Sequence, residues 1–315
     1  MDIEHYDRNI FRSLILKEDL KSAMAYIGQF PEKKDLYDKY ISLFQEENYL
    51  AYDVDADLSE ILLIYQKYYR DVFYLSRDET KAAAQMRNRF AEWFKLDCTD
   101  AGISFDDMEE GPITKAFLRR GFHFLGGKTC GHYGPYIWKD EEIKHYMVKL
   151  PDGIQDYAVK FLDNFISKSW MDYLSFGEIS TGGWSNGDGL IHCIRAGYDL
   201  ESESFQVSLL KHEAQHTMDL AKYKDMTSGD LEYRAKLVEL IYSNERDLLG
   251  AFAEQADSSK PDNGHAFAAS RIIKGFEACF HLPYNKIQKL PAKDVQNTAA
   301  KLFEKSNKEI ARKYG

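Results

Sequence analysis

The chain is poor in cysteine. It has 315 residues but only four cysteines, Cys98, Cys130, Cys193 and Cys279, and no CxxC pair. Disulfide-stapled scaffolds crowd their cysteines, so this spacing excludes such a scaffold and predicts free thiols in a reducing compartment. The first residues also lack the basic and apolar regions of a signal peptide. Both absences predict a cytoplasmic protein, with a secreted protein whose leader has been removed as the alternative.

Long apolar runs and an excess of positive charge are missing as well. No stretch approaches the roughly 20 apolar residues that cross a bilayer, so we expect no transmembrane segment. Asp and Glu outnumber Lys and Arg by 51 to 41, which gives a net charge of −10. A negative field repels phosphate backbones, and the sequence has no local basic patch, so nucleic acid is not an expected partner. With 44% hydrophobic and 14% aromatic residues the chain can bury a core, which argues against disorder.

Apolar residues recur at helical spacing through the first hundred residues. The pattern runs through residues 10–15, 36–44, 61–72 and 82–94. It predicts four helices and no strand. We therefore expect an all-helical N-terminal region over residues 1–97.

The pattern changes after residue 97, where glycine and turn residues become frequent. Strand-like runs occur at 136–138, 146–150 and 190–194, and a helix is predicted over 154–170. From residue 203 onward the spacing is helical again. The sequence thus predicts an α+β protein, in which residues 98–315 form a domain with a small mixed sheet.

The segment His212-Glu213-Ala214-Gln215-His216 is an H-E-x-x-H motif. On a helix, residues four apart lie on one face, about 5–6 Å from each other, so two imidazoles there can share one zinc ion. Apolar stripes through residues 205–218 favour that helix. An apolar helix that carries two histidines and a glutamate is costly unless those groups have partners, which zinc would supply.

Catalytic zinc sites use three protein ligands and keep one position open for water. A second helix is predicted from the turn at 227–230 through residue 240, with Glu232 in its first turn as the third ligand. Glu239 lies seven residues further on the same face and is the competing ligand or an outer partner. Asp219, three residues after His216, is expected to accept the free imidazole N–H of a ligand histidine.

H-E-x-x-H followed by Glu232-x-x-Ala235 on a later helix resembles the gluzincin branch of the zinc metallopeptidases. The resemblance implies that His212, His216 and Glu232 bind one zinc ion per chain and that Glu213 is the general base. A downstream histidine often stabilises the oxyanion in this branch, which implies that role for His265.

The same resemblance implies a zincin-like fold for residues 98–315. In such folds the last strand before the metal helix lies along the cleft and pairs with an extended peptide. Here that strand would be 189–197, with residues 182–187 as a loop at its edge.

The expected function is therefore a zinc metallopeptidase that hydrolyses a peptide or protein substrate. Three alternatives stay open: a zinc hydrolase of a non-peptide amide, a zinc-binding pseudoenzyme that serves as an interaction module, and a helical structural protein with a chance H-E-x-x-H. Zinc stoichiometry separates the last from the others, and peptide cleavage identifies the peptidase. The sequence predicts no oligomeric state.

Overall fold

The computed structural model describes residues 5–96, 104–185, 189–245, 247–259, 263–287 and 289–315. It combines helices with small sheets, which confirms the predicted α+β class. The chain divides into two compact units: unit 1 comprises Met1–Asp140 and Asp163–Thr181, and unit 2 comprises Glu141–Leu162 and Gly182–Gly315. Within the described part of the chain, no helix has both the length and the apolar character needed to cross a membrane.

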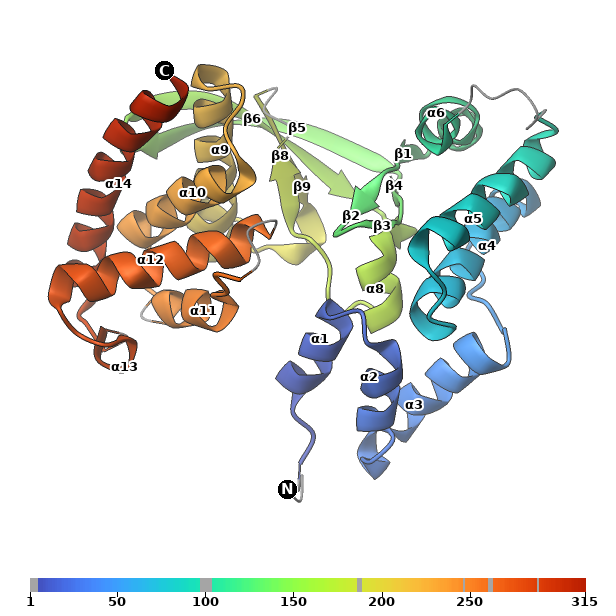
Figure 1. Ribbon diagram of the computed structural model, residues 1–315. Coiled ribbons are helices and arrows are strands. Elements are labelled where there is room, and N and C mark those ends of the chain that lie inside the picture. Colours follow the sequence, from blue (N-terminus) through green and yellow to red (C-terminus); the bar gives the residue numbers. More distant parts are fainter. Residues whose placement is uncertain (1–4, 97–103, 186–188, 246, 260–262, 288) are drawn as a thin grey trace. The chain divides into compact units, whose positions relative to one another are not determined.

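Unit 1 is built mainly from helices (Figure 1). Their bounds are α1 Arg8–Leu16, α2 Leu20–Ile27, α3 Lys34–Tyr40, α4 Ala56–Tyr69, α5 Glu79–Phe94, α6 Phe105–Met108, α7 Thr114–Leu118 and α8 Ser169–Ser175. Residues 5–96 contain helices and turns but no strand, as the sequence predicts. The prediction missed α2, whose start is capped by the Asp19 carboxylate accepting from Ser22 N–H.

The boundary between the units differs from the predicted one at residue 97. Beyond α5, Phe105, Phe117, Ile137 and Trp170 are buried in the same apolar cluster as the N-terminal helices. Short strands accompany them in unit 1: β1 His123–Leu125, β2 Lys128–Thr129, β3 His132–Tyr133, β4 Tyr136–Trp138 and β7 Ser167–Lys168. Unit 1 therefore extends beyond the predicted helical region, because these later segments belong to the same apolar core.

Unit 2 contains a four-stranded sheet in the order β5-β6-β9-β8. Its strands are β5 Asp140–Leu150, β6 Gly153–Asp163, β8 Gly183–Ser185 and β9 Leu190–Ile194, so the predicted strands at 146–150 and 190–194 are confirmed. β9 pairs in parallel with β6 and antiparallel with β8. The expectation that β9 is the edge strand is wrong. The segment 182–187, which was predicted as a loop, contains β8, and β8 is the edge strand. Residues 186–188 lie outside the described part.

The helix predicted over 154–170 is also wrong, because most of that segment is the strand β6. The prediction used the spacing of four between Tyr157 and Phe161, which fits a strand period of two as well as a helix period of 3.6. In the structure Tyr157, Val159 and Phe161 all point to the buried face of the sheet. Val159 faces Ile191 and Phe161 faces Cys193 of β9, so the parallel pairing decides the outcome.

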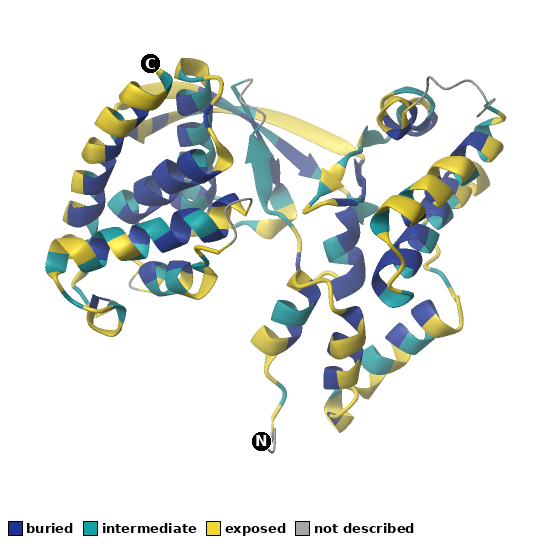
Figure 2. Cartoon of the chain, viewed as in Figure 1, coloured by how far each residue is buried: buried dark blue, intermediate teal, exposed yellow. Residues whose placement is uncertain are grey.

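The helices of unit 2 surround one buried member, α10. Their bounds are α9 Leu210–Lys222, α10 Ser228–Tyr242, α11 Leu248–Gln255, α12 Gly264–Phe280, α13 Tyr284–Ile287 and α14 Ala292–Tyr314. α10 packs against α9, α12 and α14, and it is buried along almost its whole length (Figure 2). Neighbouring helices therefore restrict the side chains of α10 on every face, so a polar side chain on this helix is held in a defined position.

Candidate metal centre

The helix α9 carries both histidines of the H-E-x-x-H motif. His212 and His216 lie one turn apart, and their Nε2 atoms are 2.9 Å from each other. On the neighbouring faces, Leu210 and Ala214 are buried in the apolar core of unit 2. This packing fixes the rotation of α9, so both imidazoles are held in a largely buried position, with side-chain exposures of 9% and 12%.

The helix α10 brings Glu232 to the two histidines. One carboxylate oxygen, Oε1, is 3.4 Å from His216 Nε2, and the other, Oε2, is 3.5 Å from His212 Nε2. The side chain of Glu232 is only 11% exposed. Ala235, one turn further along α10, is fully buried. The predicted ligands His212, His216 and Glu232 therefore form one cluster, whose ligand atoms all lie within 4.8 Å of one another.

The spacing of this cluster fits a zinc ion. Two ligands that each lie 2.0–2.1 Å from a tetrahedral zinc are about 3.3 Å apart. The three closest separations between the side chains are 2.9, 3.4 and 3.5 Å. Two neutral imidazoles and one carboxylate are also a ligand set that zinc accepts. The side chains need only small adjustments to hold the ion and would leave a fourth position free.

Glu239 lies on the other side of His212. Its Oε1 atom is 2.6 Å from His212 Nδ1, and the residue is 5% exposed. An acceptor at Nδ1 keeps the proton on that nitrogen and turns Nε2 toward the cluster. Between the two glutamates that the sequence left as competitors, the structure places Glu232 among the ligand atoms and Glu239 behind the imidazole.

The carboxylates around His212 change its acidity and that of Glu232. Burial disfavours the charged imidazole, but the hydrogen bond to Glu239 and the charges of Glu239, Glu232 and Glu213 raise the pKa of His212 to about 9. Burial likewise disfavours ionised Glu232, but contacts with His216 and His265 and the charge of His212 hold its pKa well below its usual range. At neutral pH Glu232 is therefore ionised, whereas His212 keeps a proton that a zinc ion bound at Nε2 would displace.

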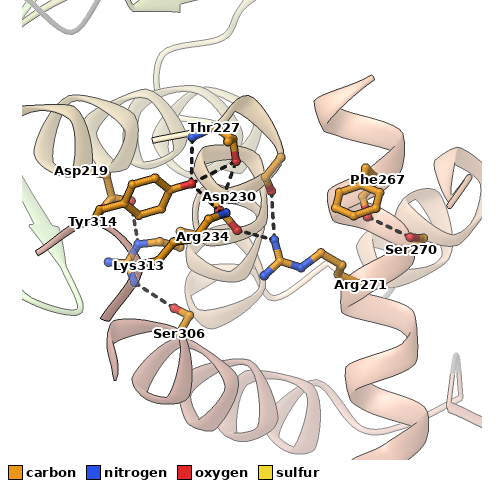
Figure 3. Close-up of polar contacts among 11 residues, drawn as sticks. Asp219, Thr227, Asp230, Arg234, Phe267, Ser270, Arg271, Ser306, Lys313 and Tyr314 are labelled. Carbon is orange, nitrogen blue, oxygen red and sulfur yellow. Dashed lines mark hydrogen bonds and ion pairs between the residues drawn. The ribbon is translucent and has the colours of Figure 1, made fainter. Parts of the chain in front are cut away.

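The role predicted for Asp219 is corrected by the structure. Its carboxylate accepts a hydrogen bond from Arg234 Nε at 2.7 Å, not from a ligand histidine (Figure 3). Both side chains are almost fully buried, with exposures of 4% and 3%. Arg234 also donates to Ser306 and Asn307 of α14. Asp219 lies one turn beyond His216, where Arg234 from α10 reaches it first, so the pair joins the two metal-site helices.

His265 lies in the first turn of α12, as the sequence predicts. Its Nδ1 atom is 2.8 Å from Glu232 Oε2, and its side chain is 64% exposed. The helix begins at the N-cap Asn263, whose side chain accepts from Ala266 N–H. The structure thus brings His265 to the metal cluster, but through Glu232.

Glu213 follows His212 on α9 and is partly buried. Its charge acts on His212 and on the Tyr198 hydroxyl. Within the described residues its carboxylate forms no hydrogen bond or ion pair. Its carboxylate is therefore not engaged by another described side chain.

One link to the site escaped the sequence analysis. The hydroxyl groups of Thr217 on α9 and Ser185 on β8 are 2.9 Å apart. The Thr217 hydroxyl also donates to the backbone oxygen of Glu213. These contacts hold the edge strand of the sheet against the metal helix. No pattern in the sequence could reveal them, because Ser185 and Thr217 are far apart in the chain.

Comparison of the chain with protein-family models, with curated proteins and with solved structures finds no match in any of the three. The functional argument therefore rests on the geometry of the site and on the motif.

Proposed function

We propose that the protein is a zinc-dependent metallopeptidase with a zincin-like catalytic unit. The convergence of His212, His216 and Glu232 from two packed helices carries this proposal. Their separations match a tetrahedral zinc site, and Glu239 orients the first ligand. The order of H-E-x-x-H and E-x-x-A, which resembles the gluzincin branch, supports the same assignment.

His212, His216 and Glu232 would hold a zinc ion, which would supply a Lewis acid that polarises a carbonyl group and lowers the pKa of a water molecule toward 7. Glu213 accepts a proton from the water molecule while the oxygen of that water attacks the carbonyl carbon. Glu213 then delivers that proton to the amide nitrogen, which leaves as an amine when the C–N bond breaks. His212, His216 and Glu232 hold their positions throughout, and Glu239 keeps the proton on His212 Nδ1.

The preference for a peptide as substrate rests on the motif order, because H-E-x-x-H followed by E-x-x-A resembles a branch of the zinc metallopeptidases. β8 ends the order of its sheet, and the contact between Ser185 and Thr217 holds it beside α9.

The first test is metal analysis of the purified wild type after zinc loading. We expect about one zinc per chain, because the site has one ligand set. His212→Ala or His216→Ala should abolish tight binding, because each leaves two protein ligands. Wild type without zinc would refute the proposal.

The second test is catalysis. A peptide-library screen should identify a substrate for the zinc-loaded wild type. Glu213→Gln keeps the size of the side chain but removes the base, so we expect unchanged zinc content and a 10²–10⁴-fold slower cleavage. Glu304→Gln, an exposed change on α14, is the matched control and should cleave like wild type. Equal rates for Glu213→Gln and wild type would refute the mechanism. Zinc binding without any peptide cleavage would favour the pseudoenzyme or the non-peptide hydrolase.

A further inference from the structure

The helices α10 and α12 begin side by side, at a contact that leaves little room for a larger residue than glycine. A Cβ atom on Gly264 would lie 2.1 Å from Ser228 Oγ and 3.1 Å from the backbone carbonyl carbon of Ser228. On the partner helix, a Cβ on Gly229 would lie 3.0 Å from the ring of Phe267. Two glycines, one on each helix, therefore let the two N-termini approach closely.

Polar contacts fix the same pair of helices further along. Arg271 of α12 donates to the Asp230 carboxylate of α10 at 2.6 Å, and its guanidinium lies 4.1 Å from the centre of the Tyr233 ring (Figure 3). Lys313 and Tyr314 of α14 donate to the other oxygen of Asp230 at 2.7 and 2.8 Å. These contacts determine the rotation of α12 about its axis, and with it the direction of the side chain after Gly264.

That side chain is His265, which meets the metal cluster at one oxygen of Glu232. The His265 Nδ1 atom is 2.8 Å from Oε2, which also lies 3.5 Å from His212 Nε2, while the other oxygen, Oε1, is 3.4 Å from His216 Nε2. A carboxylate that is paired with a histidine at one oxygen is held in one orientation beside the cluster. Partners that hold ligand groups typically change metal affinity by 10–100-fold.

We infer that His265 is a positioning residue of the proposed metal centre, which pairs with Oε2 of Glu232 and so holds this carboxylate in the orientation that zinc binding needs. The inference rests on the proposed zinc site and deepens it. It is distinct from the oxyanion role that the sequence suggested, because it assigns Nδ1 to the carboxylate and gives no role to Nε2. It also makes α12 a third element of the site, placed by the glycine contact with α10.

Zinc affinity separates this role from the others. Wild type, His265→Ala and His265→Asn would be compared by competition with a chromophoric chelator, after circular dichroism has shown that each is folded. We expect about 10–100-fold weaker binding for His265→Ala. Asparagine places an N–H close to the position of Nδ1, so His265→Asn should recover most of the loss. An oxyanion residue would instead leave zinc affinity unchanged when removed, and that result would overturn the inference.

X-ray absorption of the zinc-loaded wild type tests the remaining role, direct ligation. We expect two imidazole ligands, from His212 and His216. Three imidazoles would show that His265 binds zinc itself and would overturn the inference while leaving the metal site intact. Wild type that binds no zinc would overturn the proposed function and this inference together, so the two failures are distinguishable.

A second variant tests the glycine contact without touching the cluster. Gly264→Ala would force α12 away from Ser228, and we expect zinc binding to weaken in the same direction as in His265→Ala. Gly250→Ala is the matched control, because there the added Cβ would meet nothing closer than the Tyr284 hydroxyl at 3.8 Å. Zinc affinity in folded Gly264→Ala equal to that of wild type would overturn the placement of His265 by this contact.

Discussion

Replacing each of two glutamates of α10 by glutamine tests how the site divides their roles. Glu232 and Glu239 lie on one face of the same helix and are both buried, with exposures of 8% and 5%. Glu232→Gln and Glu239→Gln therefore make the same chemical change in similar surroundings. The difference in zinc affinity between the two variants then reports how each glutamate lies relative to the proposed metal.

The expected magnitudes follow from the contacts. In wild type the Glu239 carboxylate lies 2.6 Å from His212 Nδ1. Glutamine at position 239 would still offer an oxygen to this nitrogen but would lose the negative charge. We expect a 10–100-fold loss of zinc affinity, or about 1.4–2.7 kcal/mol. Glutamine at 232 removes the only anionic ligand, so the loss should exceed about 100-fold.

Two assays measure this ranking. Competition with a chromophoric chelator at fixed pH and ionic strength gives the dissociation constants. Thermal unfolding gives an independent value, because zinc at 100 times its dissociation constant stabilises the folded state by about 2.7 kcal/mol. For a cooperative unit of about 150–250 residues this raises Tm by roughly 5–11 °C. Glu232→Gln should lose most of that increase at the same zinc concentration.

The opposite ranking would refute the assignment. If Glu239→Gln weakens zinc binding more than Glu232→Gln, then Glu239 is the ligand and the cluster geometry has been misinterpreted. Equal losses would also contradict the distinction between a ligand and a partner behind the imidazole. Both variants need unchanged circular dichroism without zinc for the comparison to hold.

Two further predictions concern stability. In unit 1, burial raises the pKa of Glu109 to about 7, although Tyr65 and Gly127 N–H donate to it. A raised carboxyl pKa contributes stability at low pH that is lost as the pH rises through 7. Wild type should therefore lose about 2.5 kcal/mol more of its free energy of unfolding than Glu109→Gln between pH 5 and 8, as measured by urea unfolding. In unit 2, Arg234→Met leaves buried Asp219 unpaired and should cost about 3–5 kcal/mol, and adding Asp219→Asn should recover part of it. A stability difference between wild type and Glu109→Gln that does not change with pH would contradict the first prediction. A double variant no more stable than Arg234→Met would contradict the second.

The sequence alone determined features that depend on local spacing. The period of 3.6 places His212 and His216 on one face of α9, and no distant contact is needed for that result. The same holds for α1, α3, α4 and α5, whose apolar residues recur every three or four positions, whereas α2 was missed. The strand at Leu190–Ile194 could also be predicted, because the run is short and mostly apolar and glycine residues lie on both sides of it.

Local spacing could not distinguish a helix from a strand where both periods fit. In β6 the residues 157 and 161 are four apart, and four is a multiple of the strand period. The parallel pairing with β9 decided the matter, and that pairing joins segments about thirty residues apart. The boundary between the units escaped prediction for a similar reason, since Phe105 and Trp170 complete a core that begins with Phe11.

The choice among the acids of the site depended on tertiary structure as well. Glu232 and Glu239 are seven residues apart, so they share a face of α10 but lie about 10 Å apart along its axis. Sequence reasoning cannot rank them, because either could meet a histidine from another helix. The packing of α10 against α9 inserts the His212 ring between them, with Nε2 toward Glu232 and Nδ1 toward Glu239. The residue types and their spacing thus supplied a set of candidate ligands, and only the contact between two helices gave each acid its place.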